Sequence, residues 1–289
     1  MISVKLQTRV AIPEDQKQIA NLMFFESHVH RHLDWRTPLD WLGSHYFWVL
    51  EENARILAVL ACPEDPAGVA WVRLFAHAAG VDLFQAWEML WHTALQKIPG
   101  HGAVTVAVIA MHDWFGAILA DSGFTHTQDI LMLELHTLRA APVARPGSVR
   151  IREMTLDDLA EVARVDAAAF KRLWQNPESS LALALPQASV ATVAEDRCGL
   201  VGYQIATANP FGAHLARLAV RPEAQNHGLG SQLVADLVER LRQQGAKRLT
   251  VNTQSDNHAS LALYRKMGFV ESGERFPVYC YDVSGQVAG

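Results

Sequence analysis

The pattern of hydrophobic and polar residues is clearest in the last third of the chain. An apolar run, Leu215 to Val220, leads through a polar loop into a long amphipathic segment, Gly228 to Gln244. This pattern predicts a strand, a glycine-containing loop and a helix that begins on the glycines. A second strand at residues 248–252 and a second helix at residues 257–267 are expected to follow.

The rest of the second half predicts further strands and helices. Thr155 or Asp157 can cap a helix that runs to Phe170, and the segment Lys171–Gln187 is less regular. Strands are expected at Val149–Glu153, Ser189–Glu195, Leu200–Ala208 and Arg275–Val283, with a hairpin-type turn at residues 196–199. This half therefore predicts a mixed sheet with helices.

The two halves of the chain resemble each other weakly at a nearly constant spacing. Arg9, Asp15 and Ile19 match Arg152, Asp158 and Val162 at an offset of 143, Val72-Arg73-Leu74 matches Ala216-Arg217-Leu218 at 144, and Gly123-Phe124 matches Gly268-Phe269 at 145. Such a repeat indicates a duplicated domain. Residues 141–148, with prolines and a glycine, are the best linker candidate, which predicts domains at 1–141 and 148–289.

The glycine loop predicts an anion site. A helix that begins on Gly228 and Gly230 has free backbone N–H groups and the positive end of the helix dipole, and no side chain blocks a phosphate. A dinucleotide fingerprint would require a third glycine where Leu233 stands. A nucleotide P-loop would require Gly-Lys-Ser/Thr, which is also missing. A pyrophosphate carrier of another kind is therefore indicated.

The residues Gln225, Gly228 and Gly230 match the Q/R-x-x-G-x-G/A motif of the GNAT acyl-CoA N-acyltransferases, which this stretch resembles. Asn257–Phe269 matches the second motif of that family with its spacing shifted by one. The resemblance implies an α/β fold of two GNAT-like domains, each with a mixed, mostly antiparallel sheet and helices on both faces. It also implies direct transfer of an acetyl group from acetyl-CoA to a primary amine. The alternative is a non-catalytic acyl-CoA-binding module or ligand sensor.

The resemblance also implies which residues hold acetyl-CoA. In the family the fourth and fifth strands splay apart, and the pantetheine arm lies between them against the free backbone of the fourth strand. This role falls on Leu218, Ala219 and Val220. The other implied contacts are Gln225, Asn226, His227, Gly228, Leu229, Gly230, Ser231, Asn252, Asn257 and Ser260.

Tyr264 and His214 are the candidate catalytic residues. By resemblance, Tyr264 points at the thioester sulfur and can donate to the leaving thiolate. Its alternative role is to pack the helix as a half-buried aromatic. His214 stands where the family often has a carboxylate base, and histidine can accept a proton near neutral pH. His214 could equally be a polar residue at the start of a strand, with its hydrogen bonds made inside the protein. Glu223 is the second candidate base.

The sequence of the first half indicates the same fold, but it lacks the residues that would hold CoA. It has a single glycine, Gly80, where the loop should be, and Leu119 stands where Tyr264 stands in the second half. It carries seven of the eight tryptophans and ten of the thirteen histidines, which indicate either a core and interface or a substrate cleft. On a helix His28 and His32 would share a face. No other ligand completes a metal site, so no metal is expected.

Charge and cysteine content limit the partners and the compartment. The net charge is −5, which argues against nucleic acid. Residues 1–144 hold 9 basic and 15 acidic residues, whereas residues 145–289 hold 16 and 15, so the half with the anion site is less acidic. The three cysteines are scattered, and neither a membrane span nor a signal peptide is found. A cytoplasmic monomer or homodimer with a small-molecule or peptide amine acceptor is expected.

Overall fold

The computed structural model describes residues 6–32, 34–98, 102–138 and 149–284. The chain separates into two compact units, which we call unit 1 (residues 1–128 with 276–289) and unit 2 (residues 129–275). The predicted linker at residues 141–148 lies outside the described residues, so the predicted domains 1–141 and 148–289 stay a prediction. In the described part of the chain, no helix is long and apolar enough to cross a membrane.

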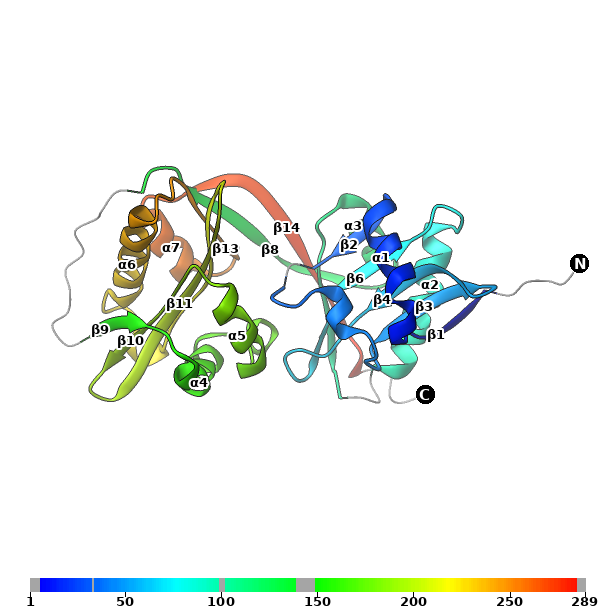
Figure 1. The fold of residues 1–289 in the computed structure, drawn as a ribbon, viewed down its shortest axis with the longest axis horizontal. Coiled ribbons are helices and arrows are strands. Elements are labelled where there is room, and N and C mark those ends of the chain that lie inside the picture. Colours follow the sequence, from blue (N-terminus) through cyan, green and yellow to red (C-terminus); the bar gives the residue numbers. More distant parts are fainter. Residues whose placement is uncertain (1–5, 33, 99–101, 139–148, 285–289) are drawn as a thin grey trace, which may run out of the picture. The chain divides into compact units, whose positions relative to one another are not determined.

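Unit 2 is built on a mixed sheet with the strand order β14-β8-β13-β12-β11-β10-β9 (Figure 1). Its strands are β8 (Thr125–Leu135), β9 (Arg150–Glu153), β10 (Val190–Asp196), β11 (Gly199–Asn209), β12 (Gly212–Val220), β13 (Leu249–Gln254) and β14 (Val270–Asp282). Its helices are α4 (Leu159–Ala169), α5 (Glu178–Ala184), α6 (Leu229–Gln243) and α7 (His258–Lys266). The boundaries of the units fall inside β8 and β14, so each of these strands contributes residues to both units.

Helices cover both faces of the unit 2 sheet, because neighbouring side chains on a strand point to opposite faces. Tyr203 on β11 points to α4, where its hydroxyl donates to Asp166. A Cβ on the preceding Gly202 would lie 3.3 Å from Leu233 on α6. On the α6 face, Leu215 and Val251 belong to one hydrophobic cluster with Leu237 and Leu241 of the helix.

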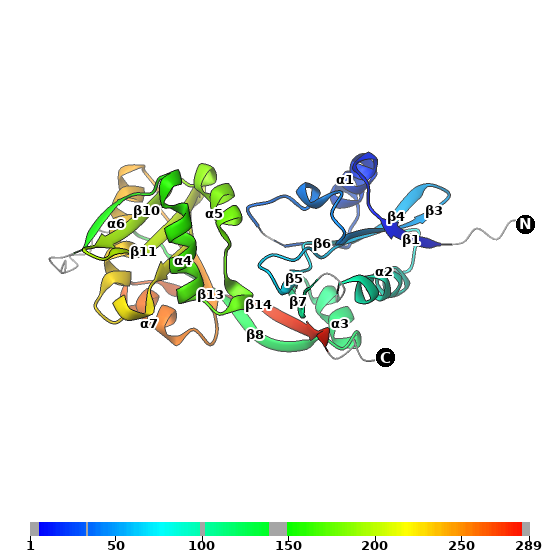
Figure 2. The same ribbon diagram turned by 90° about the horizontal axis from the view of Figure 1, so that it is seen from below.

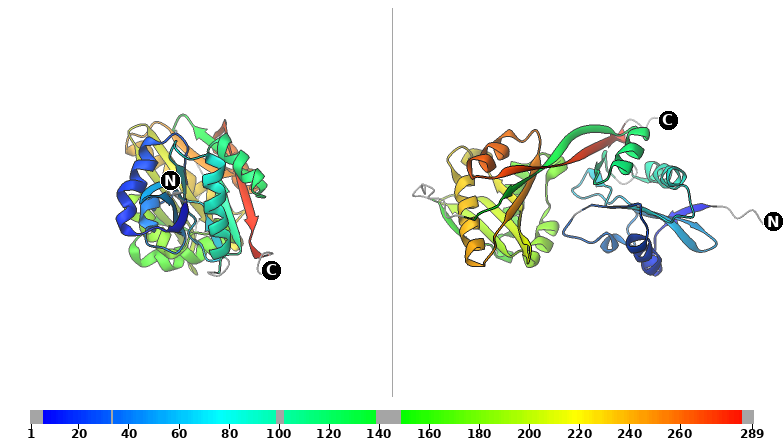
Figure 3. Two further views of the ribbon diagram at one scale, coloured as in Figure 1. Left: turned by 90° about the vertical axis from the view of Figure 1, so that its right-hand side faces the viewer. Right: turned by 90° about the horizontal axis from the view of Figure 1, so that it is seen from above.

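Unit 1 has the strands β1 (Gln7–Val10), β2 (Val29–Arg31), β3 (Phe47–Glu52), β4 (Arg55–Ala61), β5 (Val69–Trp71), β6 (Leu74–His77) and β7 (Thr105–Ile109). Its helices are α1 (Gln16–Phe25), α2 (Leu83–Lys97) and α3 (Asp113–Asp121). Helix α1 lies on one face of the β1-β3-β4-β6-β2 sheet and α2 on the other (Figures 2 and 3). Each face therefore has its own hydrophobic cluster.

Strand registers confirm that the two units repeat one fold. The parallel pair Val69–Thr105 in unit 1 corresponds to Ala213–Leu249 in unit 2, with an offset of 144 on both strands. The β4–β6 pairs correspond to the β11–β12 pairs, since Ala61–Leu74 becomes Gln204–Leu218 at offsets of 143 and 144. Strands β5 and β6 together thus form the counterpart of β12.

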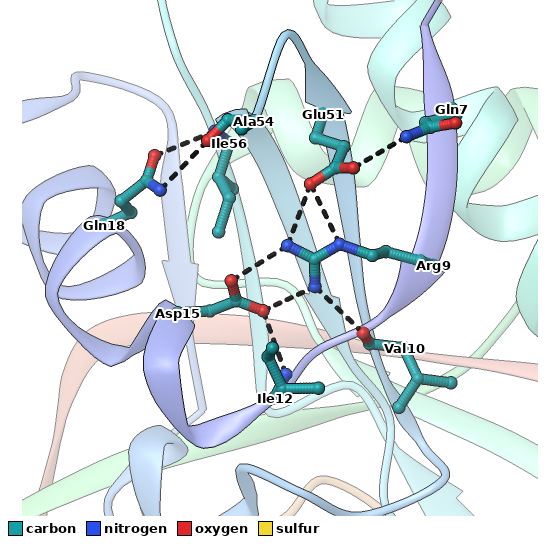
Figure 4. Close-up of polar contacts among 9 residues, drawn as sticks. All are labelled: Gln7, Arg9, Val10, Ile12, Asp15, Gln18, Glu51, Ala54 and Ile56. Atoms are coloured by element: carbon teal, nitrogen blue, oxygen red, sulfur yellow. Dashed lines mark hydrogen bonds and ion pairs between the residues drawn. The ribbon is translucent and has the colours of Figure 1, made fainter.

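The same ion-pair network begins each unit. Arg9 binds Asp15 at 2.6 Å and Glu51 at 2.8 Å, and Asp15 also accepts from the backbone N–H of Ile12 (Figure 4). In unit 2, Arg152 binds Asp158 at 2.8 Å and Glu195 at 2.9 Å. Asp158 accepts from the backbone N–H of Thr155. Thr155 is the N-cap of a short 3-10 helix, Leu156–Asp158, that leads into α4, and the N-cap of α4 itself is Asp158 rather than either predicted residue.

Three expectations change with the structure. The segment 171–187 contains a helix, α5, that its composition did not reveal. Residues Val29–Arg31 form a strand, so the expectation that His28 and His32 share a helical face is wrong. Four of the seven tryptophans are core residues, which favours the core interpretation for these four: Trp48, Trp71, Trp87 and Trp91.

Candidate functional site

The edge of β12 that faces β13 is open over its last residues. Parallel pairing between the two strands covers Ala213–Leu215 and Leu249–Val251. Beyond that point Leu218, Ala219 and Val220 pair with β11 alone among the described strands. The β11–β12 register shifts at Ala216, where a bulge bends the strand. The backbone groups of this stretch that point away from β11 are thus available to an extended ligand, except the carbonyl of Val220, which accepts from the side chain of Gln225.

The helix α6 begins at the end of this open edge. Gly228 is its N-cap and has a φ of 81°, a left-handed conformation that favours glycine. A Cβ on Gly228 would meet no atom within 4 Å, so the space in front of the helix is open. The unpaired N–H groups of the first turn and the helix dipole make this end attractive to an anion.

Two of the predicted loop residues, Gly230 and Gln225, also hold the local structure together. A Cβ on Gly230 would lie 3.0 Å from Leu263, so Gly230 allows α6 to approach α7 closely. The side chain of Gln225 donates to the carbonyl of Val220 at 2.9 Å and fixes the loop to the end of β12. The structure therefore brings the loop and the open edge together through Gln225.

The other predicted cofactor residues fall into exposed and buried groups. Asn226, His227 and Asn252 are exposed, whereas Leu229 and Ser231 are buried in the first turn of α6. Asn257 caps α7, because its side-chain oxygen accepts from the backbone N–H of Ser260 at 3.1 Å. The helix cap thus already uses one acceptor position of Asn257.

Tyr264 lies on α7 and is 4% exposed. Its ring packs against Phe269, with 5.5 Å between the ring centroids. Burial raises the pKa of the phenol, and the positive charge of Arg217 opposes this shift. Among the described residues, its hydroxyl has no hydrogen-bond partner. The phenol is therefore protonated at neutral pH and has its proton available for an acceptor.

His214 lies on β12 in the stretch that is paired with β13. Its Nδ1 is 2.8 Å from Thr250 Oγ1, and the Thr250 hydroxyl donates to the carbonyl of Ala213. Thr250 therefore accepts from Nδ1–H, which leaves Nε2 of His214 with a lone pair that can take a proton. Burial lowers the pKa of His214, so the ring is neutral at pH 7. The alternative base, Glu223, is exposed in the loop before α6.

His214 also lines a shallow pocket at the start of β12. The pocket is formed by polar side chains, one exposed aromatic ring and the backbone of the β11–β12 hairpin: Thr207, Asn209, Phe211, Gly212, Ala213, His214, Arg248 and Thr250. It lies at the opposite end of β12 from the glycine loop. A polar acceptor could therefore reach His214 without crossing the anion site.

A buried ionic network next to the open edge was not predicted. Arg217 lies one residue before Leu218 and donates to both carboxylate oxygens of Asp166, at 2.8 and 2.9 Å. Asp166 is fully buried and also accepts from the hydroxyl of Tyr203 at 2.5 Å. The sequence did contain one sign of this network: Asp166 is a charged residue on the apolar face of a predicted helix.

The network also fixes the chain that follows α4. Arg217 donates to the carbonyl of Trp174 at 2.5 Å, and its guanidinium lies 3.6 Å from the centre of the Phe170 ring. The backbone N–H of Asn176 donates to Asp166 at 2.7 Å. Residues 170–176 are therefore held beside the position where the β12 edge opens.

In unit 1 the corresponding edge is closed. Strand β2 pairs with β6, with Val29 opposite Ala76 and Arg31 opposite Leu74. Leu74 and Ala76 correspond to Leu218 and Val220 of unit 2. A strand of the protein itself thus occupies the edge that is open in unit 2, and Leu119 at the Tyr264 position is fully buried.

Comparison with known proteins gives a family for the second half of the chain. The model of the acetyltransferase (GNAT) family matches residues 156–269. A putative [ribosomal protein bS18]-alanine N-acetyltransferase of Bacillus subtilis is 27% identical over 129 residues, which are 45% of this chain and 85% of that protein. The corresponding enzyme of Escherichia coli is 36% identical over 67 residues, which are 23% of this chain and 45% of that enzyme.

Among solved structures, the fold is similar to that of a tandem GNAT protein from the clavulanic acid biosynthesis pathway. The TM-score is 0.66 at 18% sequence identity, and the alignment covers 97% of this chain and 99% of that one. At this identity the similarity shows a shared fold. It extends over both units, in agreement with the duplication that the strand registers show.

Proposed function

Because this chain belongs to the GNAT acetyltransferase family, through residues 156–269, we propose that unit 2 transfers an acetyl group from acetyl-CoA directly to a primary amine. The open edge of β12, which ends at the N-terminus of α6, carries this proposal. The backbone of Leu218–Val220 would pair with the pantetheine arm. The pyrophosphate would lie at the N–H groups that follow Gly228.

The chemistry requires a base, an oxyanion donor and an acid. In our proposal Nε2 of His214 takes the amine proton, directly or through water, as the nitrogen attacks the thioester carbon. A backbone N–H of the Leu218–Val220 strand stabilises the oxyanion. The carbon–sulfur bond then breaks, and Tyr264 donates its proton to the leaving thiolate. At neutral pH the His214 ring is neutral and can accept a proton, and the Tyr264 phenol is protonated and can donate one.

Release of CoA thiol in the presence of different amines tests the proposal. The first amines to test are α-amino acids and peptides with N-terminal alanine, because the similar proteins include acetyltransferases named for alanine and for L-methionine sulfoximine. Acetylated product, identified by mass, should accumulate in proportion to thiol. Thiol release at the same rate with and without amine would indicate hydrolysis and contradict the proposal.

The variant Tyr264→Phe tests the acid. We expect kcat to fall roughly ten- to ten-thousand-fold, the range for acid–base groups, with little change in KM for acetyl-CoA, because the hydroxyl acts as charge develops on sulfur. Steady-state kinetics with the best amine gives both constants. Leu263→Met, on the same helix, is the packing control. An unchanged kcat for Tyr264→Phe, with chemistry limiting turnover, would remove Tyr264 from the mechanism.

One acetyl-CoA is expected per chain. Strand β2 fills the edge of unit 1, no paired glycines precede α2, and the first half carries an acidic excess that disfavours a ligand with several phosphate charges. Isothermal titration calorimetry with acetyl-CoA should give a stoichiometry of one. A stoichiometry of two would show that unit 1 opens its β6 edge to a second cofactor.

A further inference from the structure

Unsatisfied polar atoms gather in one region of unit 1. The side chains of residues 30–44 and of Arg73 include buried nitrogen and oxygen atoms that lack a hydrogen-bond partner, among them His32 Nδ1, Arg36 Nε and Arg73 Nε. An unpaired buried polar group costs about 1–3 kcal/mol. The group also includes acceptor atoms, the carboxylate oxygen Asp34 Oδ2 and the hydroxyl of Ser44, but most of the unpaired atoms are nitrogens. Buried nitrogens that lack an acceptor indicate that an acceptor binds there.

His32 and Arg73 lie side by side in this cluster. The backbone N–H of His32 donates to the carbonyl of Arg73 at 3.0 Å, and the register of β2 and β6 places the two residues opposite each other. Side chains directly opposite in antiparallel strands are about 5 Å apart. Both side chains also flank Trp71, whose ring is 5.0 Å from the His32 ring and 5.9 Å from the Arg73 guanidinium carbon.

The repeat shows which bond of its counterpart Arg73 does not make. Arg217 is its counterpart in unit 2, and its Nε donates to the carboxylate of Asp166. At the offset of 143 that places Arg9 on Arg152, the position of Asp166 is taken in unit 1 by Met23. Arg73 uses its terminal nitrogens on Asp34 at 3.1 Å and on the Asp65 carbonyl at 3.4 Å, and its Nε is left unpaired.

We propose that unit 1 binds the carboxylate group of a small organic acid, with one oxygen on Arg73 Nε and the other on His32 Nδ1. This external carboxylate would accept from Nε of Arg73 as Asp166 accepts from Nε of Arg217. A planar carboxylate matches two neighbouring N–H donors. The Trp71 ring provides an apolar wall for the rest of the acid, so an organic acid suits the site better than an inorganic anion.

The protonation of His32 agrees with this assignment. Burial and the charge of Arg73 lower the pKa of His32 well below its usual value. The ring is therefore neutral, and with the proton on Nδ1 it is a donor that adds no second positive charge. A bound carboxylate would raise the pKa of His32, since a nearby negative charge favours the protonated ring.

Nuclear magnetic resonance of the full chain with labelled histidine rings tests the site. Sodium acetate is the probe, at constant ionic strength and pH, and inorganic phosphate is the second titrant. We expect acetate to shift the His32 signals saturably and phosphate to have at least tenfold lower affinity. His92 and His136, both exposed, are internal controls for unspecific effects. Absence of a saturable His32 shift, or preference for phosphate, would overturn the proposal.

Two variants separate binding from folding. The double variant Arg73→Gln with Asp34→Asn removes the pair together, so that no single buried charge is left, and should weaken acetate at least tenfold. His32→Phe keeps Arg73 and should also weaken acetate, which thermal-shift titration can follow without the His32 signal. Wild-type acetate affinity in both folded variants would place acetate elsewhere and contradict the proposed site.

Discussion

Acetyl-CoA binding is expected to be lost in the variant Gly228→Glu, by at least about 100-fold or about 2.8 kcal/mol. A side chain at this position projects into the open space in front of α6, where the pyrophosphate is proposed to lie. The new carboxylate would repel the phosphates and would itself occupy the anion position. A negative charge at a helix N-terminus is favourable to the helix, so the variant should fold. Isothermal titration calorimetry with acetyl-CoA measures the loss.

The matched control is Gly228→Ala. It carries the same backbone strain, since any residue with a Cβ pays about 1–2 kcal/mol in the left-handed conformation, but it adds no charge and meets no atom within 4 Å. The alanine variant should bind acetyl-CoA within a few-fold of the wild type. Equal affinities of the glutamate and alanine variants would show that the pyrophosphate does not lie at this helix end.

The variant Asp166→Ala is expected to lower the free energy of unfolding by about 3–5 kcal/mol, the usual cost of removing one partner of a buried ion pair. It would leave the guanidinium of Arg217 and the hydroxyl of Tyr203 without their acceptor inside unit 2. The backbone N–H of Asn176 would also lose its acceptor. Urea unfolding followed by circular dichroism gives the change.

Glu161→Ala, on the same helix α4, is the control for the loss of a carboxylate. Glu161 binds Arg221 and Arg164, but its side chain is 31% exposed, so the expected loss is at most about 1 kcal/mol. If Asp166→Ala cost no more than Glu161→Ala, the buried network would not be a main support of unit 2. Activity of the folded Asp166→Ala variant would then show whether residues 170–176 help to place the acceptor.

The sequence predicted those parts of the protein that depend on local patterns. The strand to Val220, the glycine loop and α6 follow from apolar periodicity and from the conformational freedom of Gly228, and all are present. The repeat was visible in part because Arg9 and Asp15 recur as Arg152 and Asp158. These residues make the same ion pairs in each unit, so their spacing is fixed by the fold.

What the sequence could not predict depends on contacts between distant residues. The three residues of β2 are too few to show a strand period, and their pairing with β6 spans more than forty positions. The Asp166–Arg217 pair joins a helix to a strand that lies 51 positions further along the chain, so neither residue alone indicates its partner. The roles of Tyr264, His214 and the cofactor contacts remain predictions that the variants above are designed to test.

Because β14 contributes residues to both units, the order of synthesis on the ribosome affects when unit 1 can complete its sheet. Residues Val278–Asp282 pair with β7 of unit 1, yet they are synthesised after all of unit 2. At about 5–20 residues per second, the edge of β7 would wait on the order of 10 s for its partner. An unpaired strand edge is a template for association with other chains. The unit that is synthesised first is therefore the one that completes its sheet last.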